Sequence, residues 1–129
     1  MVQDRNSGRR PTVLLAEDEL LVAMDIEASL RELGWEVVGP VATVAEVERL
    51  AEHPDLDAAV LDVNLRGVKI FPILPRLLAR GLPVLLSSGY EEVSLFPDEF
   101  RRLPVLVKPY DARQLAAAVT ALTGSPDSA

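Results

Sequence analysis

The sequence of 129 residues contains no cysteine, which excludes a disulfide framework and any thiolate metal site. It also has no apolar run approaching the roughly 20 residues that a membrane-spanning helix needs. Residues 1–11 are polar, and no apolar segment follows them as it would in a signal peptide. We therefore expect a cytoplasmic protein that makes no contact with the membrane.

Positive charge is also scarce. Lysine and arginine number 13 against 20 acidic residues, so the formal net charge is −7. An excess of negative charge opposes binding to phosphate backbones and favours partners that carry a basic patch. We therefore predict protein partners and no nucleic acid.

The length fits one domain, large enough to bury roughly two thirds of the surface of its unfolded chain. We expect flexible tails at residues 1–11 and 123–129, and one domain over residues 12–122. Inside the domain, five short segments are apolar almost throughout, which predicts strands buried on both faces of a sheet. They lie at residues 12–16, 35–39, 57–62, 83–88 and 104–107.

Helical patterns alternate with these strands. Apolar residues at spacings of three and four predict a helix over residues 19–33, formed by Leu20, Leu21, Met24, Ile26, Leu30 and Leu33. Capping-box pairs, Thr43 with Glu46 and Asp111 with Gln114, open two further helices. Another helix ends near Arg80, but Pro72 and Pro75 leave its start undefined. Residues 89–103 show no clear spacing of apolar residues. The alternation predicts a (βα)5 fold with a parallel sheet.

Four of the predicted strands end in a polar side chain. The first runs into Glu17 and Asp18, the third ends at Asp62, the fourth at Ser88, and the fifth is followed by Lys108. Ligands bind at the carboxyl ends of the strands in parallel sheets, so these side chains are predicted to meet at one edge.

This combination predicts a site for a divalent cation and a phosphoryl group. Carboxylate oxygens without histidine or cysteine suit a hard cation such as Mg²⁺ or Mn²⁺. Lys108 supplies a compact positive charge, and the Ser88 hydroxyl can donate a hydrogen bond to a phosphoryl oxygen. Asp62 is the best candidate for the phosphoryl acceptor, because it ends the central strand between the other acids and Lys108.

These features resemble the receiver domain of two-component response regulators over residues 12–122. The resemblance rests on the segments at residues 13–19, 59–65, 85–90 and 107–110. It implies a doubly wound, flavodoxin-like or CheY-like sheet of five parallel strands in the order 2-1-3-4-5.

The resemblance also implies roles for individual residues. Asp62 would accept a phosphoryl group from a sensor histidine kinase or a histidine phosphotransfer protein. Asp18 and Asp62 would bind Mg²⁺ directly, with the backbone carbonyl of Asn64 and with Glu17 acting through water. Ser88 and Lys108 would contact the phosphoryl group and report its presence.

Two details depart from the usual receiver pattern. Serine stands at position 88 where many receivers have threonine, and Val105 occupies the place of the usual aromatic switch residue. The segment Ser88-Gly89-Tyr90 and the irregular stretch after it resemble the "FAT GUY" subgroup, which works with kinases of the HWE or HisKA2 type. In that subgroup Phe-Ala-Thr stands where this chain has Leu-Ser-Ser. Tyr90 is a candidate to replace the missing aromatic.

The first hypothesis is thus a stand-alone response regulator that signals to an unknown downstream protein or acts as a phosphate sink. It would not be an enzyme beyond catalysing its own phosphorylation and dephosphorylation. One alternative is a haloacid dehalogenase-type phosphatase, although Asn64 stands where that family needs a second aspartate. Others are a docking module independent of phosphorylation and a flavodoxin-like flavin binder, whose phosphate loop would not begin with Glu17 and Asp18.

Overall fold

The structure is a computed structural model that describes residues 9–123, so most of both predicted tails lies outside the described residues. Five strands form the main sheet: β1 (Thr12–Ala16), β2 (Glu36–Val41), β3 (Ala58–Asp62), β6 (Val84–Gly89) and β7 (Val105–Lys108). The α-helices are α1 (Leu20–Glu32), α2 (Val44–Leu50), α3 (Leu74–Ala79), α4 (Tyr90–Val93) and α5 (Ala112–Thr123). The division into tails and one domain remains a prediction.

The five strands are parallel and lie in the order β2-β1-β3-β6-β7, which confirms the predicted order 2-1-3-4-5. In the register of the sheet, Asp62 of β3 pairs with Ser87 of β6, and Ser88 pairs with Val107 of β7. The ends of the central strands are therefore level, and the loops that follow them start from one edge.

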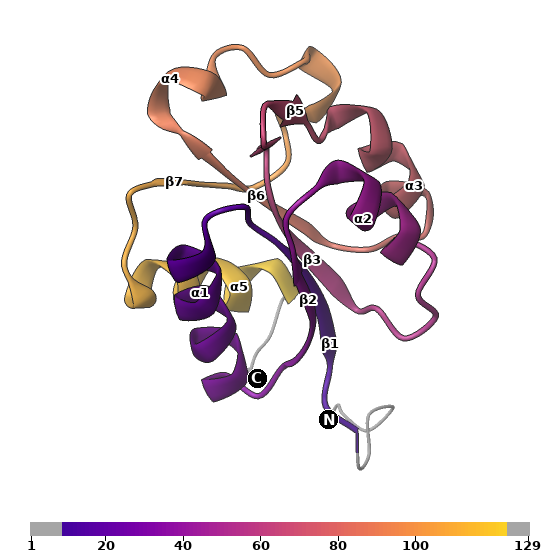
Figure 1. Ribbon diagram of the computed structural model, residues 1–129, viewed down its shortest axis with the longest axis vertical. Coiled ribbons are helices and arrows are strands. Elements are labelled where there is room, and N and C mark those ends of the chain that lie inside the picture. Colours follow the sequence, from indigo (N-terminus) through magenta and orange to yellow (C-terminus); the bar gives the residue numbers. More distant parts are fainter. Residues whose placement is uncertain (1–8, 124–129) are drawn as a thin grey trace.

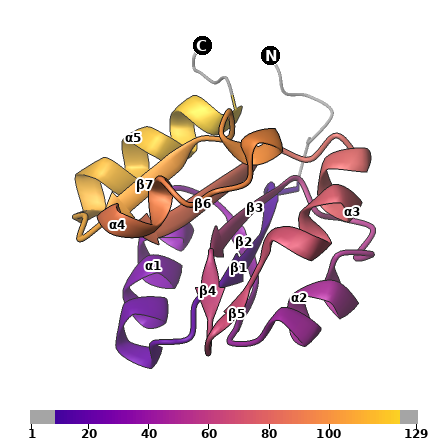
Figure 2. The same ribbon diagram turned by 90° about the horizontal axis from the view of Figure 1, so that it is seen from above.

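Helices cover both faces of the sheet. Helices α1 and α5 lie on one face, and α2 and α3 lie on the other (Figures 1 and 2). Successive residues of β1 point to opposite faces: Val13 and Leu15 belong to one buried cluster, and Leu14 and Ala16 belong to the other. Every residue of the inner strands β1 and β3 is buried, which explains their continuously apolar sequences, whereas the edge strands β2 and β7 are only partly buried.

The first helix ends as the sequence predicts, but its apolar residues do not form one buried face. Gly34 has a φ of +99° and terminates α1, with its N–H donated to the carbonyl of Arg31. Only Ala23, Ile26 and Leu30 of the helix are buried. A helix that covers one face of a sheet buries one stripe, and four predicted apolar residues lie outside it: Leu20, Leu21, Met24 and Leu33.

Strand β2 extends two residues beyond its predicted end at Gly39, to Pro40 and Val41. Gly39 has a φ of +107°, and a Cβ atom there would lie 2.6 Å from the carbonyl oxygen of Leu15. The pairing of β1 with β2 shifts register at this point. Because β2 is an edge strand, Pro40 can lack an N–H without removing a hydrogen bond from the centre of the sheet.

The two prolines that obscured the start of α3 belong to two short helices. Pro72 lies in the first turn of a 3-10 helix, η2 (Phe71–Ile73), and Pro75 lies in the first turn of α3. Proline is tolerated there because the N–H groups of a first turn have no helical partner.

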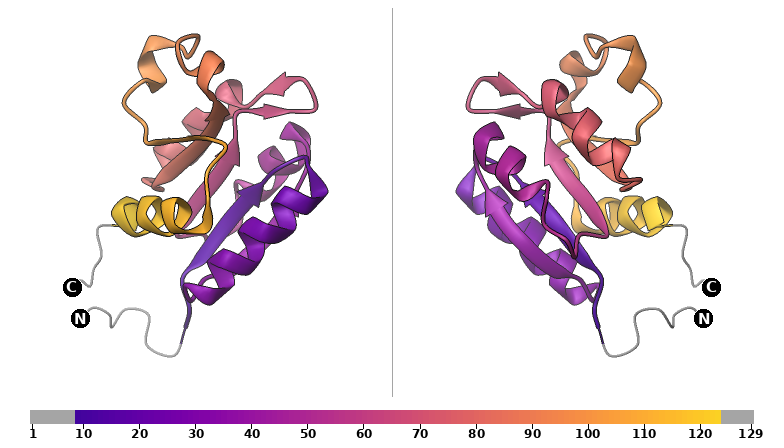
Figure 3. Two further views of the ribbon diagram at one scale, coloured as in Figure 1. Left: turned by 90° about the vertical axis from the view of Figure 1, so that its left-hand side faces the viewer. Right: turned by 90° about the vertical axis from the view of Figure 1, so that its right-hand side faces the viewer.

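The chain after β3 forms a two-stranded antiparallel hairpin. Strand β4 (Asn64–Leu65) pairs with β5 (Val68–Lys69) through Arg66 and Gly67, whose φ angles are +55° and +85°. Such angles at both central residues are typical of tight hairpin turns. The hairpin projects from the main sheet at the end of β3 (Figure 3).

Residues 89–103 contain only short helical turns, as their weak periodicity predicts. The single turn of α4 is followed by a 3-10 helix, η3 (Asp98–Phe100). Phe96 and Phe100 pack on Phe71, with ring centroids 5.1 and 5.6 Å apart, respectively. These aromatic contacts attach the segment to the α3 side of the sheet. None of the helices between residues 9 and 123 combines the length and the apolar character needed to cross a membrane.

Candidate functional site

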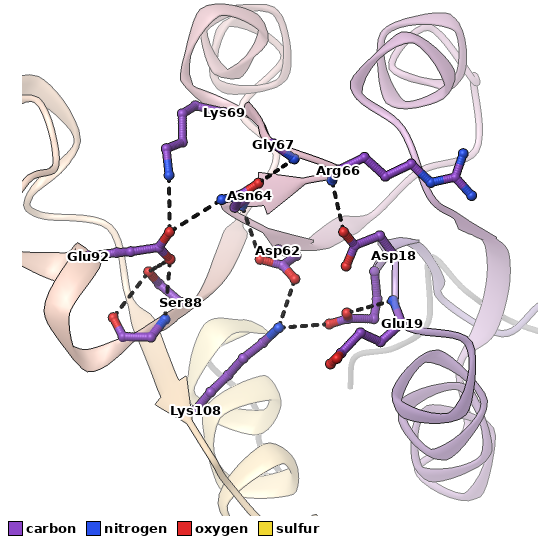
Figure 4. Close-up of polar contacts among 12 residues, drawn as sticks. Asp18, Glu19, Asp62, Asn64, Arg66, Gly67, Lys69, Ser88, Glu92 and Lys108 are labelled. Atoms are coloured by element: carbon purple, nitrogen blue, oxygen red, sulfur yellow. Dashed lines mark hydrogen bonds and ion pairs between the residues drawn. The ribbon is translucent and has the colours of Figure 1, made fainter.

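The polar side chains predicted from the strand ends lie together at one edge of the sheet. Glu17 and Asp18 follow β1, Asp62 ends β3, Ser88 lies near the end of β6, and Lys108 ends β7. Figure 4 shows Asp62 between Asp18 on one side and Ser88 on the other, with Lys108 approaching it from below. The parallel topology thus brings together residues that are up to 91 positions apart in the sequence (108 − 17 = 91).

Lys108 makes ion pairs with two buried carboxylates. Its Nζ atom lies 2.8 Å from Asp62 Oδ2 and 3.2 Å from Glu17 Oε1. The side chains of Asp62 and Glu17 are only 6% and 1% exposed. Burial by itself lowers the pKa of Lys108, but the hydrogen bond and charge of Asp62, together with Glu17, raise it above its ordinary value. Lys108 is therefore protonated at neutral pH.

Three carboxylates form a cluster beside this lysine. Glu17, Asp18 and Asp62 each offer one oxygen, and these atoms all lie within 4.8 Å of one another. Burial raises the pKa of Glu17, and the charge of Asp62 adds to this effect, although the backbone N–H of Glu19 donates to Glu17 and opposes it. Three acids and one lysine leave a deficit of positive charge, and the oxygen donors fit a hard divalent cation.

Backbone N–H groups of the hairpin hold two of these carboxylates. The N–H of Asn64 donates to Asp62 Oδ1 at 3.0 Å, and the N–H of Arg66 donates to Asp18 Oδ2 at 2.8 Å. The hairpin thus fixes both carboxylates from above, as Figure 4 shows. The contact between Arg66 and Asp18 spans 48 positions, and no local sequence pattern indicates it.

Ser88 lies at the predicted edge but donates its hydrogen bond to a residue that the sequence analysis missed. The hydroxyl is fully buried, and its Oγ lies 3.0 Å from Oε1 of Glu92. Glu92 follows Gly89 by three residues, and its side chain accepts from the backbone N–H of Gly89 at 3.4 Å. A capping pattern of this kind was the one indication of its position available in the sequence.

The two residues connected with the missing aromatic switch line the same pocket. Tyr90 is 81% exposed, whereas Val105 is partly buried against the core. Both line a surface pocket of about 710 Å³ between α4 and β7. The replacement of the aromatic residue by Tyr90 remains a prediction.

Comparison with known proteins identifies similar chains, although no protein-family model matches this one. SdrG from Sphingomonas melonis Fr1 is 39% identical, with 88% of this chain and 96% of that one covered and a TM-score of 0.76. The response regulator protein PmrA of Pseudomonas aeruginosa is 36% identical over 118 residues, covering 86% of this chain and 52% of PmrA. This chain spans about half the length of the curated relatives it matches.

A second similar structure contains a metal. It is the receiver domain of the sensor histidine kinase PA1611 from Pseudomonas aeruginosa PAO1, solved with a magnesium ion coordinated in its active site cleft. That domain is 26% identical to this chain, with a TM-score of 0.74, and the match covers 90% of this chain and 99% of the domain.

Proposed function

The chain belongs to the receiver domain family of response regulators, and from this premise we propose that it accepts a phosphoryl group on Asp62. The observation that carries the proposal is the position of this carboxylate. Asp62 ends the central strand, its Oδ2 faces the Lys108 ammonium at 2.8 Å, and two further acids lie beside it. Glu17 also pairs with Lys108, but Asp62 makes the shorter ion pair, 2.8 Å against 3.2 Å, and it is the cluster member that ends the central strand.

The proposed chemistry is a transfer between two nucleophiles. A carboxylate oxygen of Asp62 forms a bond to phosphorus while the bond from phosphorus to the histidine nitrogen of the donor breaks. The ion pair with Lys108 holds the Asp62 carboxylate at the edge of the sheet. After transfer, the same ammonium is close enough to pair with an oxygen of the phosphoryl group.

We propose that a divalent cation takes part and that it binds to the acidic cluster. Asp18, Asp62 and the backbone carbonyl of Asn64 would hold Mg²⁺ or Mn²⁺, with Glu17 acting through water. The all-oxygen donors support this assignment, as does the magnesium ion in the cleft of the PA1611 receiver domain. When bound, the cation would neutralise part of the negative charge on the transferred group.

We propose that the phosphoryl donor is a sensor histidine kinase or a histidine phosphotransfer protein. The Ser88-Gly89-Tyr90 segment favours a kinase of the HWE or HisKA2 type, which a phosphotransfer profile against the kinases of the source organism would test. A donor must approach the edge of the sheet, where Leu20 and Leu21 of α1 are 72% and 76% exposed. We expect Leu21→Ser to slow transfer from the kinase but not from a small phosphodonor; equal rates from the kinase would remove α1 from the contact.

The proposed function differs from that of an enzyme that turns over a phosphorylated substrate. A phosphatase of the haloacid dehalogenase type needs a second aspartate two residues after its nucleophile, and Asn64 stands there. We therefore expect no turnover of p-nitrophenyl phosphate beyond the background rate. A docking module independent of phosphorylation would instead bind its partner equally well as wild type and as Asp62→Ala.

The labelling experiment uses acetyl phosphate with Mg²⁺. Wild-type protein should acquire one phosphoryl group, Asp62→Ala should acquire none, and removal of the cation with a chelator should abolish the labelling. Asp25→Ala, which removes an exposed acid of α1, should label like wild type. Labelling of Asp62→Ala to the same extent as wild type would rule out the proposed acceptor.

A further inference from the structure

The side chain of Glu92 connects three parts of the candidate site. Its Oε1 accepts the hydrogen bond of the Ser88 hydroxyl at 3.0 Å, and its Oε2 forms an ion pair with Lys69 at 3.0 Å. The same Oε2 lies 3.5 Å from the side-chain nitrogen of Asn64. Figure 4 shows these contacts on the opposite side of Asp62 from Asp18.

Glu92 is an ionised hydrogen-bond acceptor in this position. The hydrogen bond from Lys69 holds the pKa of its carboxyl at about 2 against the effect of partial burial, with further help from Ser88 and Asn64. Lys69 and Asn64 pair with each other across the hairpin, so both donors come from one rigid unit. The carboxylate is therefore anchored by the hairpin while it holds the hydroxyl of β6.

The Ser88 hydroxyl has a single proton to donate, and two acceptors compete for it. In this structure Glu92 accepts it, whereas the proposed function requires Ser88 to contact a phosphoryl oxygen on Asp62. Both acceptors are anions, so a hydroxyl placed between them can satisfy only one. We propose that Glu92 is a positioning residue that holds the Ser88 hydroxyl in the unphosphorylated domain and loses it when a phosphoryl group occupies Asp62.

This proposal rests on the proposed function and adds a competing acceptor to it. The free energy that breaks the contact between Ser88 and Glu92 must come from the contact between Ser88 and the phosphoryl group. The binding of a phosphoryl analogue is therefore weaker than it would be without Glu92. Loss of this hydrogen bond also removes one link between Glu92 of α4 and Ser88 of β6, so the event at Asp62 is transmitted to residues 90–93.

The test measures the affinity of the folded domain for beryllofluoride in the presence of Mg²⁺, by amide NMR titration. Glu92→Ala should bind beryllofluoride about three- to tenfold more tightly than wild type, the factor expected when one competing hydrogen bond is removed. Glu91→Ala is the matched control, because it removes an equal charge from the same turn at an exposed position, and it should change the affinity less than about twofold.

The Glu92→Ala substitution made in a Ser88→Ala protein shows whether the gain in affinity comes from competition for the hydroxyl or only from the loss of a negative charge. In Ser88→Ala, which has no hydroxyl, Glu92→Ala should bring no further gain in affinity. A gain of the same size in that background would overturn the proposal, because it would show only the loss of a nearby negative charge. Glu92→Met, which keeps the length of the side chain but has no oxygen to accept the hydroxyl, serves as the second variant if thermal unfolding shows that Glu92→Ala does not fold.

The outcomes distinguish the inference from the function on which it rests. If wild type binds beryllofluoride and Glu92→Ala binds it no more tightly than Glu91→Ala, the positioning role is wrong and Asp62 remains the acceptor. If folded wild type does not bind beryllofluoride with Mg²⁺ at all, the proposed function fails and the inference fails with it.

Discussion

The Lys108 ammonium lies 2.8 Å from Asp62 Oδ2, and the same ammonium pairs with Glu17 at 3.2 Å. One cation therefore serves two carboxylates that have almost no access to water. The arrangement places a positive charge where a phosphoryl group on Asp62 would need one. It also makes the stability of the site depend on a single side chain, because either acid without Lys108 would be buried and unpaired.

Replacement of Lys108 tests this dependence. We expect Lys108→Met, which keeps the length of the side chain, to lower the free energy of unfolding by about 1–3 kcal/mol in the absence of metal. Mg²⁺ should restore part of the loss, since it supplies positive charge to the same acids. Urea unfolding with and without Mg²⁺ measures both effects, and Arg102→Met is an exposed control. A loss no larger than that of the control would contradict the account.

Neutralisation of Glu17 should have the opposite effect on the metal-free domain. Burial raises the pKa of Glu17, so folding disfavours its charged form relative to the unfolded chain. We expect Glu17→Gln to raise the urea midpoint of the metal-free protein and to weaken Mg²⁺ binding about tenfold or more. Glu19→Gln, an exposed neighbour, should change neither quantity much. Unchanged Mg²⁺ affinity in Glu17→Gln would exclude Glu17 from the metal site.

Gly39 provides a test of the sheet itself. A Cβ at this position would combine a positive φ with a clash against the carbonyl oxygen of Leu15, so Gly39→Ala should cost about 2 kcal/mol or more. Gly34 has a positive φ but open space around it, and Gly34→Ala should cost about 1 kcal/mol. Gly89→Ala meets neither obstacle and should be nearly neutral. Equal costs for all three variants in urea unfolding would contradict the described geometry.

Tyr110 gives a prediction for pH dependence. Burial raises the pKa of its phenol from 10.0 to about 12, and the charge of Glu17 adds to the effect. A raised pKa stabilises the fold below pH 10, and this contribution is lost as the pH rises from 10 to about 12. In Tyr90→Phe, where Tyr110 is the only tyrosine, an absorbance titration should show a midpoint near 12. A midpoint of 10 in protein that is still folded by circular dichroism would be inconsistent with a buried phenol.

Much of the fold and of the candidate site can be predicted from the apolar strand segments and the polar residues at their ends. The apolar segments predicted five parallel strands in the observed order, because strands buried on both faces have a distinctive sequence. The parallel topology alone then predicts that Asp62 and Lys108 lie close together, because the carboxyl ends of parallel strands lie at one edge of the sheet. The capping pair of Thr43 and Glu46 placed the start of α2 correctly, as both of its hydrogen bonds are present.

The rest depends on contacts that local patterns do not encode. Helix α4 has four residues, which is too short for helical periodicity, and the contact of Glu92 with Lys69 spans 23 positions. The exposure of Leu20 and Leu21 was missed for a related reason. Apolar spacing identifies a helix, but only its packing against the sheet decides which of its apolar residues are buried.

The central claim is that Asp62 carries the phosphoryl group, and chemical mapping of the modified residue tests it most directly. After phosphorylation with acetyl phosphate and Mg²⁺, borohydride reduction converts an aspartyl phosphate to homoserine, which peptide mass spectrometry can locate. The account predicts homoserine at position 62 and nowhere else, and none when Mg²⁺ is withheld. Homoserine at Asp18, or modified protein with an unaltered Asp62 peptide, would contradict it.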